Sequence, residues 1–267
     1  MFERRAATVN LQTPAQSTIA GSAARLFRQA WRSVAAVLAP PVCSLCGAPG
    51  RWPGAHVALD LCEHCLAALP AVTSVASLSC GPVWALASYD YPADHMIRAL
   101  KFHGERVYGR VLGTLLGERR AADPRALPQV VLPVPLHRQR FSERGFNQAA
   151  EIAQFAAQVL GLPMDQRLLL RPRATLEQSE LAAAARHRNV RGAFEVTRSR
   201  VPAHIALVDD VLTTGSTLNE AARALQMAGV ASIEVWVAAR VAEVGDAWLK
   251  PESRSVLASV PQRELRR

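Results

Sequence analysis

The sequence predicts an α/β domain that follows a small cysteine-rich module. Three apolar runs, 130–135, 205–208 and 233–239, have the composition of strands that are buried on both faces. Amphipathic helices are expected after the first two runs, so strands and helices alternate as they do in α/β proteins. The chain has 267 residues, 50% of them hydrophobic, which is enough for one sizeable domain and a small appendage.

The segment 205–217 carries the most specific pattern in the chain. An apolar run leads into Asp209 and Asp210 at the expected end of a strand, and an amphipathic helix that ends at Gly229 should follow. Backbone N–H groups at a helix N-terminus and side-chain hydroxyls suit phosphate oxygens, and the carboxylates suit ribose hydroxyls or a metal-bound diol. We therefore predict a site for a phosphorylated sugar. The alternative is an Asp-rich turn without function, which the repulsion between adjacent carboxylates disfavours. The candidate phosphate-binding residues are Thr213, Thr214, Gly215, Ser216 and Thr217.

This segment resembles the phosphoribosyl pyrophosphate (PRPP) signature of the type I phosphoribosyltransferases. A hydrophobic run, Asp-Asp, Thr-Thr-Gly and Thr stand in the order of that signature. A P-loop is excluded because no Lys follows Gly215. The resemblance implies a type I phosphoribosyltransferase fold, with an open, mostly parallel sheet and helices on both faces. It also implies PRPP or a related phosphorylated sugar or nucleotide as ligand, together with magnesium.

A second candidate anion site follows the strand 130–135. The loop 136–144 is strongly basic, and a helix that opens at 145–148 and ends at Gly161 should come next. Ligands of open α/β sheets bind at the carboxyl ends of the strands, which favours a binding loop over a merely solvated basic loop. A further basic turn, 101–105, follows a helix expected at 92–100. The candidate binding residues of these segments are Lys101, Arg138, Arg140, Arg144 and Asn147.

The cysteines have the spacing of a metal site. Two C-x2-C pairs, Cys43/Cys46 and Cys62/Cys65, are separated by fifteen residues, a spacing typical of zinc ribbons and knuckles. Four thiolates complete a tetrahedron and leave no open position, so we predict a structural zinc rather than a catalytic one. His56 and His64 are interpreted as bystanders. Cys80 is interpreted as a small core residue or as the remnant of a further metal module.

Charge and composition limit the classes of partner that we expect for this protein. The net charge of +9 favours anionic partners, either phosphorylated metabolites or nucleic acid. No run has the length of a transmembrane segment, and five cysteines are too few for a disulfide framework. We therefore expect a cytoplasmic protein. The expected divisions are a disordered tail with a basic amphipathic helix (1–39), a four-cysteine zinc module (40–81), a phosphoribosyltransferase-like domain (82–243) and a basic, disordered tail (244–267).

Several landmarks together resemble the ComF (competence protein F) family of phosphoribosyltransferase-like proteins. They are the cysteine module, the segment Tyr91–Lys101, Pro-Val-Pro-Leu-His at 133–137, Arg-Gly-Phe-Asn-Gln at 144–148 and the Asp-Asp signature. The resemblance covers roughly residues 40–240. By similarity to amidophosphoribosyltransferases, it implies a pyrophosphate loop at 133–135 and a mobile hood over PRPP at 171–191. Many relatives carry a second pair of cysteine knuckles, whereas this chain has only Cys80 there.

Two hypotheses for the function follow. In the first, the chain is a PRPP-binding protein or phosphoribosyltransferase that supports DNA uptake for natural transformation or DNA repair. Asp209 and Asp210 would hold the ribose hydroxyls, 213–217 the 5′-phosphate, and the basic residues the leaving pyrophosphate. The sequence shows neither a general base nor a motif that identifies the acceptor.

In the second hypothesis, the chain is a non-catalytic accessory protein for single-stranded DNA or a helicase-like partner of the DNA-uptake machinery. The same fold would then serve as a scaffold or PRPP sensor, and the zinc module would dock the partner. The net charge and the cysteine module motivate this hypothesis. Few aromatic residues stand beside basic ones in the sequence, so stacking platforms for bases are not evident.

Overall fold

The computed structural model describes residues 40–51, 58–72, 77–173 and 191–241. The chain divides into two compact units, Met1–Pro41 and Val42–Arg267, and the second contains the elements described below. The helix expected at 22–38, both terminal tails, His56 and most of the hood expected at 171–191 lie outside the described residues. Within the described part of the chain, we find no helix with the length and apolarity that a membrane crossing needs.

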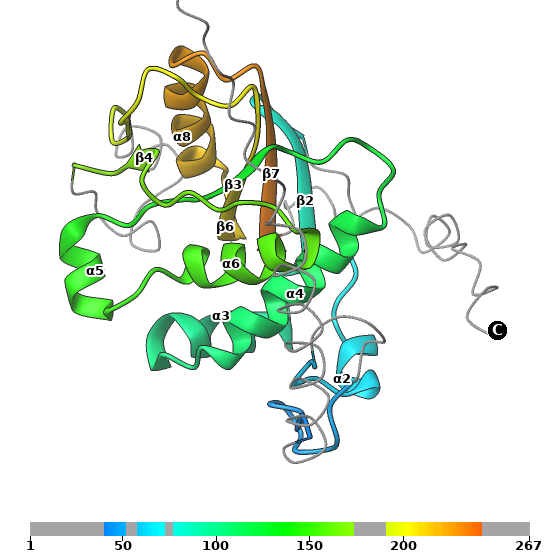
Figure 1. Cartoon of the computed structure of the whole chain (residues 1–267). Coiled ribbons are helices and arrows are strands. Elements are labelled where there is room, and N and C mark those ends of the chain that lie inside the picture. The colour runs from blue at the N-terminus through cyan, green and yellow to red at the C-terminus, as the bar shows by residue number, and fades with distance from the viewer. Residues whose placement is uncertain (1–39, 52–57, 73–76, 174–190, 242–267) are drawn as a thin grey trace, which may run out of the picture. The chain divides into compact units, whose positions relative to one another are not determined.

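A twisted sheet forms the centre of the domain (Figure 1). Its strand order is β1-β2-β7-β6-β3, in which the last four strands are parallel and β1 pairs antiparallel with β2. The expected α/β class with a parallel sheet is therefore confirmed. The strands are β1 (Ser77–Leu78), β2 (Gly81–Ser88), β3 (Val130–Pro133), β6 (His204–Leu212) and β7 (Ser232–Arg240).

Helices cover both faces of this sheet because its central strands are apolar on both sides. Ala206 and Val208 of β6 pack in one core cluster with α4 (Val107–Ala121) and α6 (Gln148–Leu160). Ile205 and Leu207 point to the other face, where they pack in a second cluster with α8 (Ser216–Met227). As expected, α6 ends at Gly161 with a left-handed backbone, and Gly229 follows the end of α8.

The connecting segments differ from expectation in three places. The basic loop expected at 136–144 contains a helix, α5 (Arg138–Arg144), because His137 accepts from the backbone of Gln139 at its start and Gly145 ends it with a φ of 78°. Strand β6 continues through the acidic pair to Leu212, because β7 is long enough to pair with it there. Helix α3 (Ala93–Arg98) runs into a π-helical turn, η1 (Ala99–His103), where a basic turn was expected.

The cysteine module packs against α4. Leu59 and Leu61 of the module are fully buried in the same core as α4 and α6. The Tyr108 hydroxyl donates to the carbonyl of Ser44 at 3.0 Å, and Arg110 of α4 forms an ion pair with Asp60. The module, with its short helix α2 (Glu63–Ala67), therefore shares one core with the domain. The boundary expected at 81/82 stays a prediction.

Candidate ligand-binding site and metal centre

A cavity of about 390 Å³ lies at the carboxyl ends of the parallel strands. Residues at or just beyond the ends of all four strands line it: Tyr89 after β2, Val134 after β3, Leu212 of β6 and Val241 after β7. This is the edge at which open α/β sheets bind ligands. Most of the candidate residues from both sequence segments line this one cavity, namely Lys101, Arg140, Arg144, Asn147, Asp209, Asp210, Thr213, Gly215, Ser216 and Thr217.

Two candidates lie apart from the cavity wall. Arg138 is exposed on α5 and does not line the cavity. Thr214 does not line it either, but its hydroxyl lies 2.8 Å from the hydroxyl of Ser216, which does. Thr214 therefore orients a neighbouring group instead of facing a ligand directly.

The loop before α8 has the backbone geometry of an anion-binding loop. Gly215 precedes the helix with a φ of 72°, a backbone conformation that L side chains rarely adopt. A Cβ at this position would lie 2.6 Å from the Cδ2 atom of Leu78, so a larger residue would also displace that side chain. The N-cap residue of α8 is Gly215, which has no side chain to cap the helix. The backbone N–H groups and dipole of the helix therefore face the cavity beside Ser216 and Thr217, which favours a phosphate.

Asp209 and Asp210, the acidic pair, both line the cavity. The Asp209 carboxylate accepts from the backbone N–H of Asp210 at 2.9 Å, and Asp210 accepts from Val211 at 2.9 Å. Burial, and then the charge of Asp210, raise the pKa of Asp209 well above its usual range, while Arg171 opposes the rise. A carboxylate in this environment is stabilised by a cation or by hydroxyl donors, which are the groups that a metal-bound diol supplies.

Cationic side chains form the surrounding wall. Arg140 and Arg144 come from α5, and Lys101 comes from the π-helical turn. The cavity wall contains two further cations that are not among the binding candidates predicted from the sequence, Arg98 of α3 and Arg171, which follows β4 (Leu169–Leu170). Arg98 stands three residues before Lys101, a spacing that places both on one face of a helix and could have revealed it.

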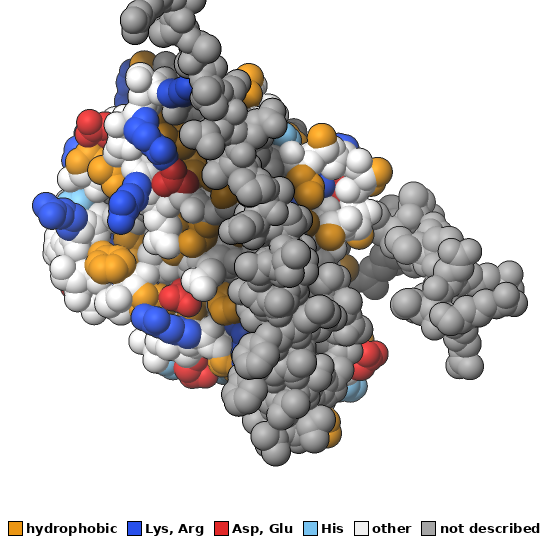
Figure 2. Space-filling model, viewed as in Figure 1, with side chains coloured by type: hydrophobic (Ala, Val, Ile, Leu, Met, Phe, Trp, Pro, Cys, Tyr) orange, Lys and Arg blue, Asp and Glu red, His pale blue; other side chains and the backbone are white. Residues whose placement is uncertain are grey.

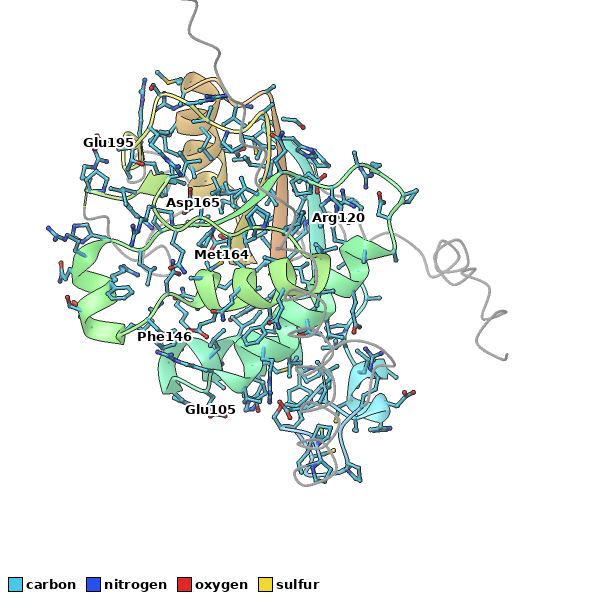
Figure 3. All side chains as sticks on the ribbon, viewed as in Figure 1. Glu105, Arg120, Phe146, Met164, Asp165 and Glu195 are labelled. Atoms are coloured by element: carbon cyan, nitrogen blue, oxygen red, sulfur yellow. The ribbon has the colours of Figure 1, made fainter. Side chains whose placement is uncertain are left out.

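The segment Arg144–Gln148 connects the cationic helix α5 to residues of the sheet and of the chain that follows it. The Asn147 side chain caps α6 through the backbone N–H of Ala149 and donates to the carbonyl of Val134, both at 3.0 Å. Gln148, which is not among the site residues predicted from the sequence, also lines the cavity and contacts Asp210. Phe146 packs beside the turn between α3 and α4, where Arg106 lies 5.1 Å from its ring (Figure 3).

The four cysteines converge as their spacing predicts. The sulfur atoms of Cys43, Cys46, Cys62 and Cys65 all lie within 4.8 Å of one another. The Cys46 and Cys62 sulfurs are 3.6 Å apart, close to the edge of about 3.8 Å that Zn–S bonds of 2.3 Å give in a tetrahedron. The donor set therefore fits a metal such as zinc.

The four thiols do not share one environment: burial raises the pKa of Cys65, whereas that of Cys43 is lowered. Burial alone would raise the pKa of Cys43, but hydrogen bonds from the backbone of Cys62, Cys46 and Leu45 outweigh it and lower the pKa to about 6. A left-handed Gly47 closes the turn after Cys46. Cys80 is half-buried against the core cluster of α8, apart from this group.

Residues 149–259 match the family model of the phosphoribosyl transferase domain. The chain is 31% identical over 207 residues to competence protein F of Haemophilus influenzae, a match that covers 75% of this chain and 85% of that protein. It is 33% identical over 213 residues to the DNA utilization protein YhgH of Salmonella typhimurium, covering 74% of this chain and 90% of that protein.

Among solved structures, the chain is similar to the glutamine PRPP amidotransferase from B. subtilis complexed with ADP and GMP. The TM-score is 0.33 and the sequence identity 20%, with 48% of this chain and 25% of that chain covered. The family assignment depends on the two sequence relatives, which the chain covers over most of their length. The chain thus belongs to the ComF/YhgH family of proteins with a phosphoribosyltransferase domain.

Proposed function

We propose that this protein binds PRPP with Mg²⁺ in the cavity at the carboxyl edge of the sheet. The observation that carries the proposal is that an uncapped helix N-terminus, two adjacent carboxylates and several cations line the same cavity. The 5′-phosphate would lie at 215–217, the ribose hydroxyls at Asp209 and Asp210, and the pyrophosphate towards Lys101, Arg140 and Arg144.

The acidic pair suits Mg²⁺ because that ion prefers carboxylate oxygens together with phosphate oxygens and water. When bound, the ion would neutralise charge between the pyrophosphate and the ribose hydroxyls. The protein's own residues would hold the ribose and the leaving group in line and would stabilise the separating charges, as in a pentosyl transfer. The described lining residues include neither an imidazole nor a thiol, so an acceptor would supply its own nucleophile.

The metal centre is proposed to hold one structural zinc ion. Four thiolates satisfy a tetrahedral ion completely, and the module shares its core with α4. Thiolate sites of this kind persist in a reducing compartment, which supports the cytoplasm as the location. The names of the relatives, competence protein F and DNA utilization protein, support a role of this chain in DNA uptake or DNA repair.

A second candidate function is favoured by exposed aromatic side chains beside cations. Tyr91, Phe102 and Phe141 are 73%, 61% and 51% exposed, and the Lys101 ammonium lies 5.1 Å from the Phe102 ring. Figure 2 shows hydrophobic and basic side chains together on the face around α5. Such surfaces stack bases of single-stranded nucleic acid, so a DNA-binding accessory role is the alternative. It requires an affinity for single-stranded DNA that falls steeply with salt and drops in Phe141→Ala.

Isothermal titration calorimetry tests the PRPP proposal. The wild-type chain should bind PRPP in the presence of Mg²⁺, and Asp210→Asn should lose that binding. Asp90→Asn is the matched control, because Asp90 is an exposed carboxylate outside the cavity. Equal binding by wild-type and Asp210→Asn would contradict the assignment.

A further inference from the structure

Gln148 connects two oppositely charged sides of the cavity. Its Nε2 donates to Oδ2 of Asp210 at 3.2 Å, and its Oε1 accepts from Nη1 of Arg144 at 2.9 Å. The side chain is only 5% exposed. It projects from the first residue of α6, whose N-terminus Asn147 fixes to the chain after β3. Gln148 therefore reaches both charged groups from a well-anchored position.

The two partners leave the amide one orientation. An arginine side chain only donates hydrogen bonds, and an ionised carboxylate only accepts them. The amide oxygen must then face Arg144 and the amide nitrogen must face Asp210. Because Gln148 carries no charge, it satisfies both groups without neutralising either.

Opposite charges within one cavity attract each other, and an arginine side chain is long enough to move. A direct ion pair between Arg144 and Asp210 would withdraw both from a ligand. Within the described residues, no ion pair involves Asp210; its carboxylate accepts from Gln148 and from the backbone of Val211. The neutral amide occupies the place between the two charges.

We propose that Gln148 is a positioning residue that holds Arg144 and Asp210 apart and in place, so that Arg144 stays available for the pyrophosphate group and Asp210 for the ribose diol. This inference rests on the proposed PRPP site. It assigns a role to a residue that carries no charge.

The test uses Gln148→Met, which keeps the length of the side chain and removes both hydrogen bonds. PRPP affinity with Mg²⁺ should fall about tenfold, because the neutral amide then no longer separates Arg144 from Asp210. Gln154→Met is the matched control on the exposed side of the same helix and should change the affinity less than twofold. If Gln148→Met fails to fold, Gln148→Glu replaces it, since its carboxylate would pair with Arg144 and repel Asp210.

The effect of Gln148→Met on PRPP affinity should also be measured in the Arg144→Met variant. This comparison separates a positioning role of Gln148 from a general structural effect. Arg144→Met removes the cation that Gln148 restrains, so adding Gln148→Met to it should cost less than threefold. An equal loss in both backgrounds, or no loss in the wild-type background, would overturn the inference while PRPP binding itself stands. A wild-type chain that binds no PRPP would overturn the proposed function and this inference with it.

Discussion

The backbone N–H of Asp210 donates a 2.9 Å hydrogen bond to the carboxylate of Asp209, which holds one acidic side chain against its neighbour near the end of β6. Burial and the charge of Asp210 raise the pKa of Asp209. Two carboxylates so arranged repel each other, and the proposed Mg²⁺ and ribose diol would offset that repulsion.

Asp209→Asn is expected to stabilise the ligand-free protein. With a raised pKa, folded Asp209 binds more protons than the unfolded chain between its ordinary and its raised pKa, so stability falls as the pH rises through that window. The substitution should raise the free energy of unfolding at pH 7 by about 1 kcal/mol, and the gain should shrink towards pH 4. Urea unfolding at both pH values measures the difference.

Asp165→Asn provides the control of opposite sign. Although burial acts against it, backbone N–H groups and Arg198 lower the pKa of Asp165, so its ionised form stabilises the fold. That substitution should cost about 1 kcal/mol at pH 7, and the cost should vanish in acid. A loss of stability in Asp209→Asn like that in Asp165→Asn would show that the acidic pair carries no strain.

Removal of the metal should destabilise the whole domain. Purified wild-type protein should contain about one zinc per chain, and Cys43→Ser and Cys62→Ser should each lose it. Because Leu59 and Leu61 are buried in the core with α4, the loss should lower the Tm by at least about 5 °C. Metal analysis and calorimetry measure both effects. Cys80→Ser should keep its zinc; full retention in the Cys43 and Cys62 variants would refute a four-thiolate site.

Substitution of alanine for Gly109, Gly113 or Gly117 of α4 should lower the free energy of unfolding by different amounts. A Cβ at Gly113 would lie 2.3 Å from the carbonyl oxygen of Ile152 on α6, and one at Gly117 would lie 2.9 Å from that of Ala156. At Gly109 the nearest atom is a side-chain carbon of Glu151, at 2.9 Å. Gly113→Ala should therefore cost the most, about 3 kcal/mol, and Gly109→Ala the least. Equal costs in thermal unfolding would mean that α4 and α6 do not pack this closely.

A buried ion pair lies at the opposite end of the sheet from the cavity. Arg120 is fully buried, bonds both carboxylate oxygens of Glu234 at 2.8 and 3.0 Å, and is labelled in Figure 3. Hydrogen bonds from Arg120 and Trp236 outweigh burial and lower the pKa of Glu234. Glu234→Gln should cost about 3 kcal/mol in urea unfolding, because it removes the carboxylate that bonds the buried Arg120 through both oxygens and leaves Arg120 with backbone carbonyls and the Asp123 carboxylate at 4.0 Å. The folded variant should bind PRPP as wild type does, and a tenfold loss of affinity would show that the two ends are coupled.

Local patterns in the sequence predict much of this fold. The apolar runs at 130–135, 205–208 and 233–239 become β3, β6 and β7, since a buried parallel strand needs apolar residues on both faces. The loop before α8 and the four-cysteine cluster are predictable for a similar reason, because each depends on residues close in the chain or at fixed spacing. Helix α5 escaped prediction, because its basic residues suggested a loop and its caps, His137 and Gly145, are weak signals.

Contacts between distant segments account for the rest of the site. Gln148 and Asp210 are separated by sixty-two positions, so their hydrogen bond follows from the packing of α6 on β6. The sequence likewise showed few aromatic residues beside basic ones, whereas Phe102 lines the cavity with Arg140 and Arg144 of α5. The sequence predicts candidate groups for the site, and the structure shows which of them line the same cavity.

A crystal structure of the protein soaked with PRPP and Mg²⁺ tests the central claim most directly. We expect the 5′-phosphate at the backbone N–H groups of 215–217, with the ribose hydroxyls beside Asp209 and Asp210 and the pyrophosphate near Arg140 and Arg144. An empty cavity at saturating PRPP, or PRPP bound only on the outer face of α5 around Arg138, would contradict it.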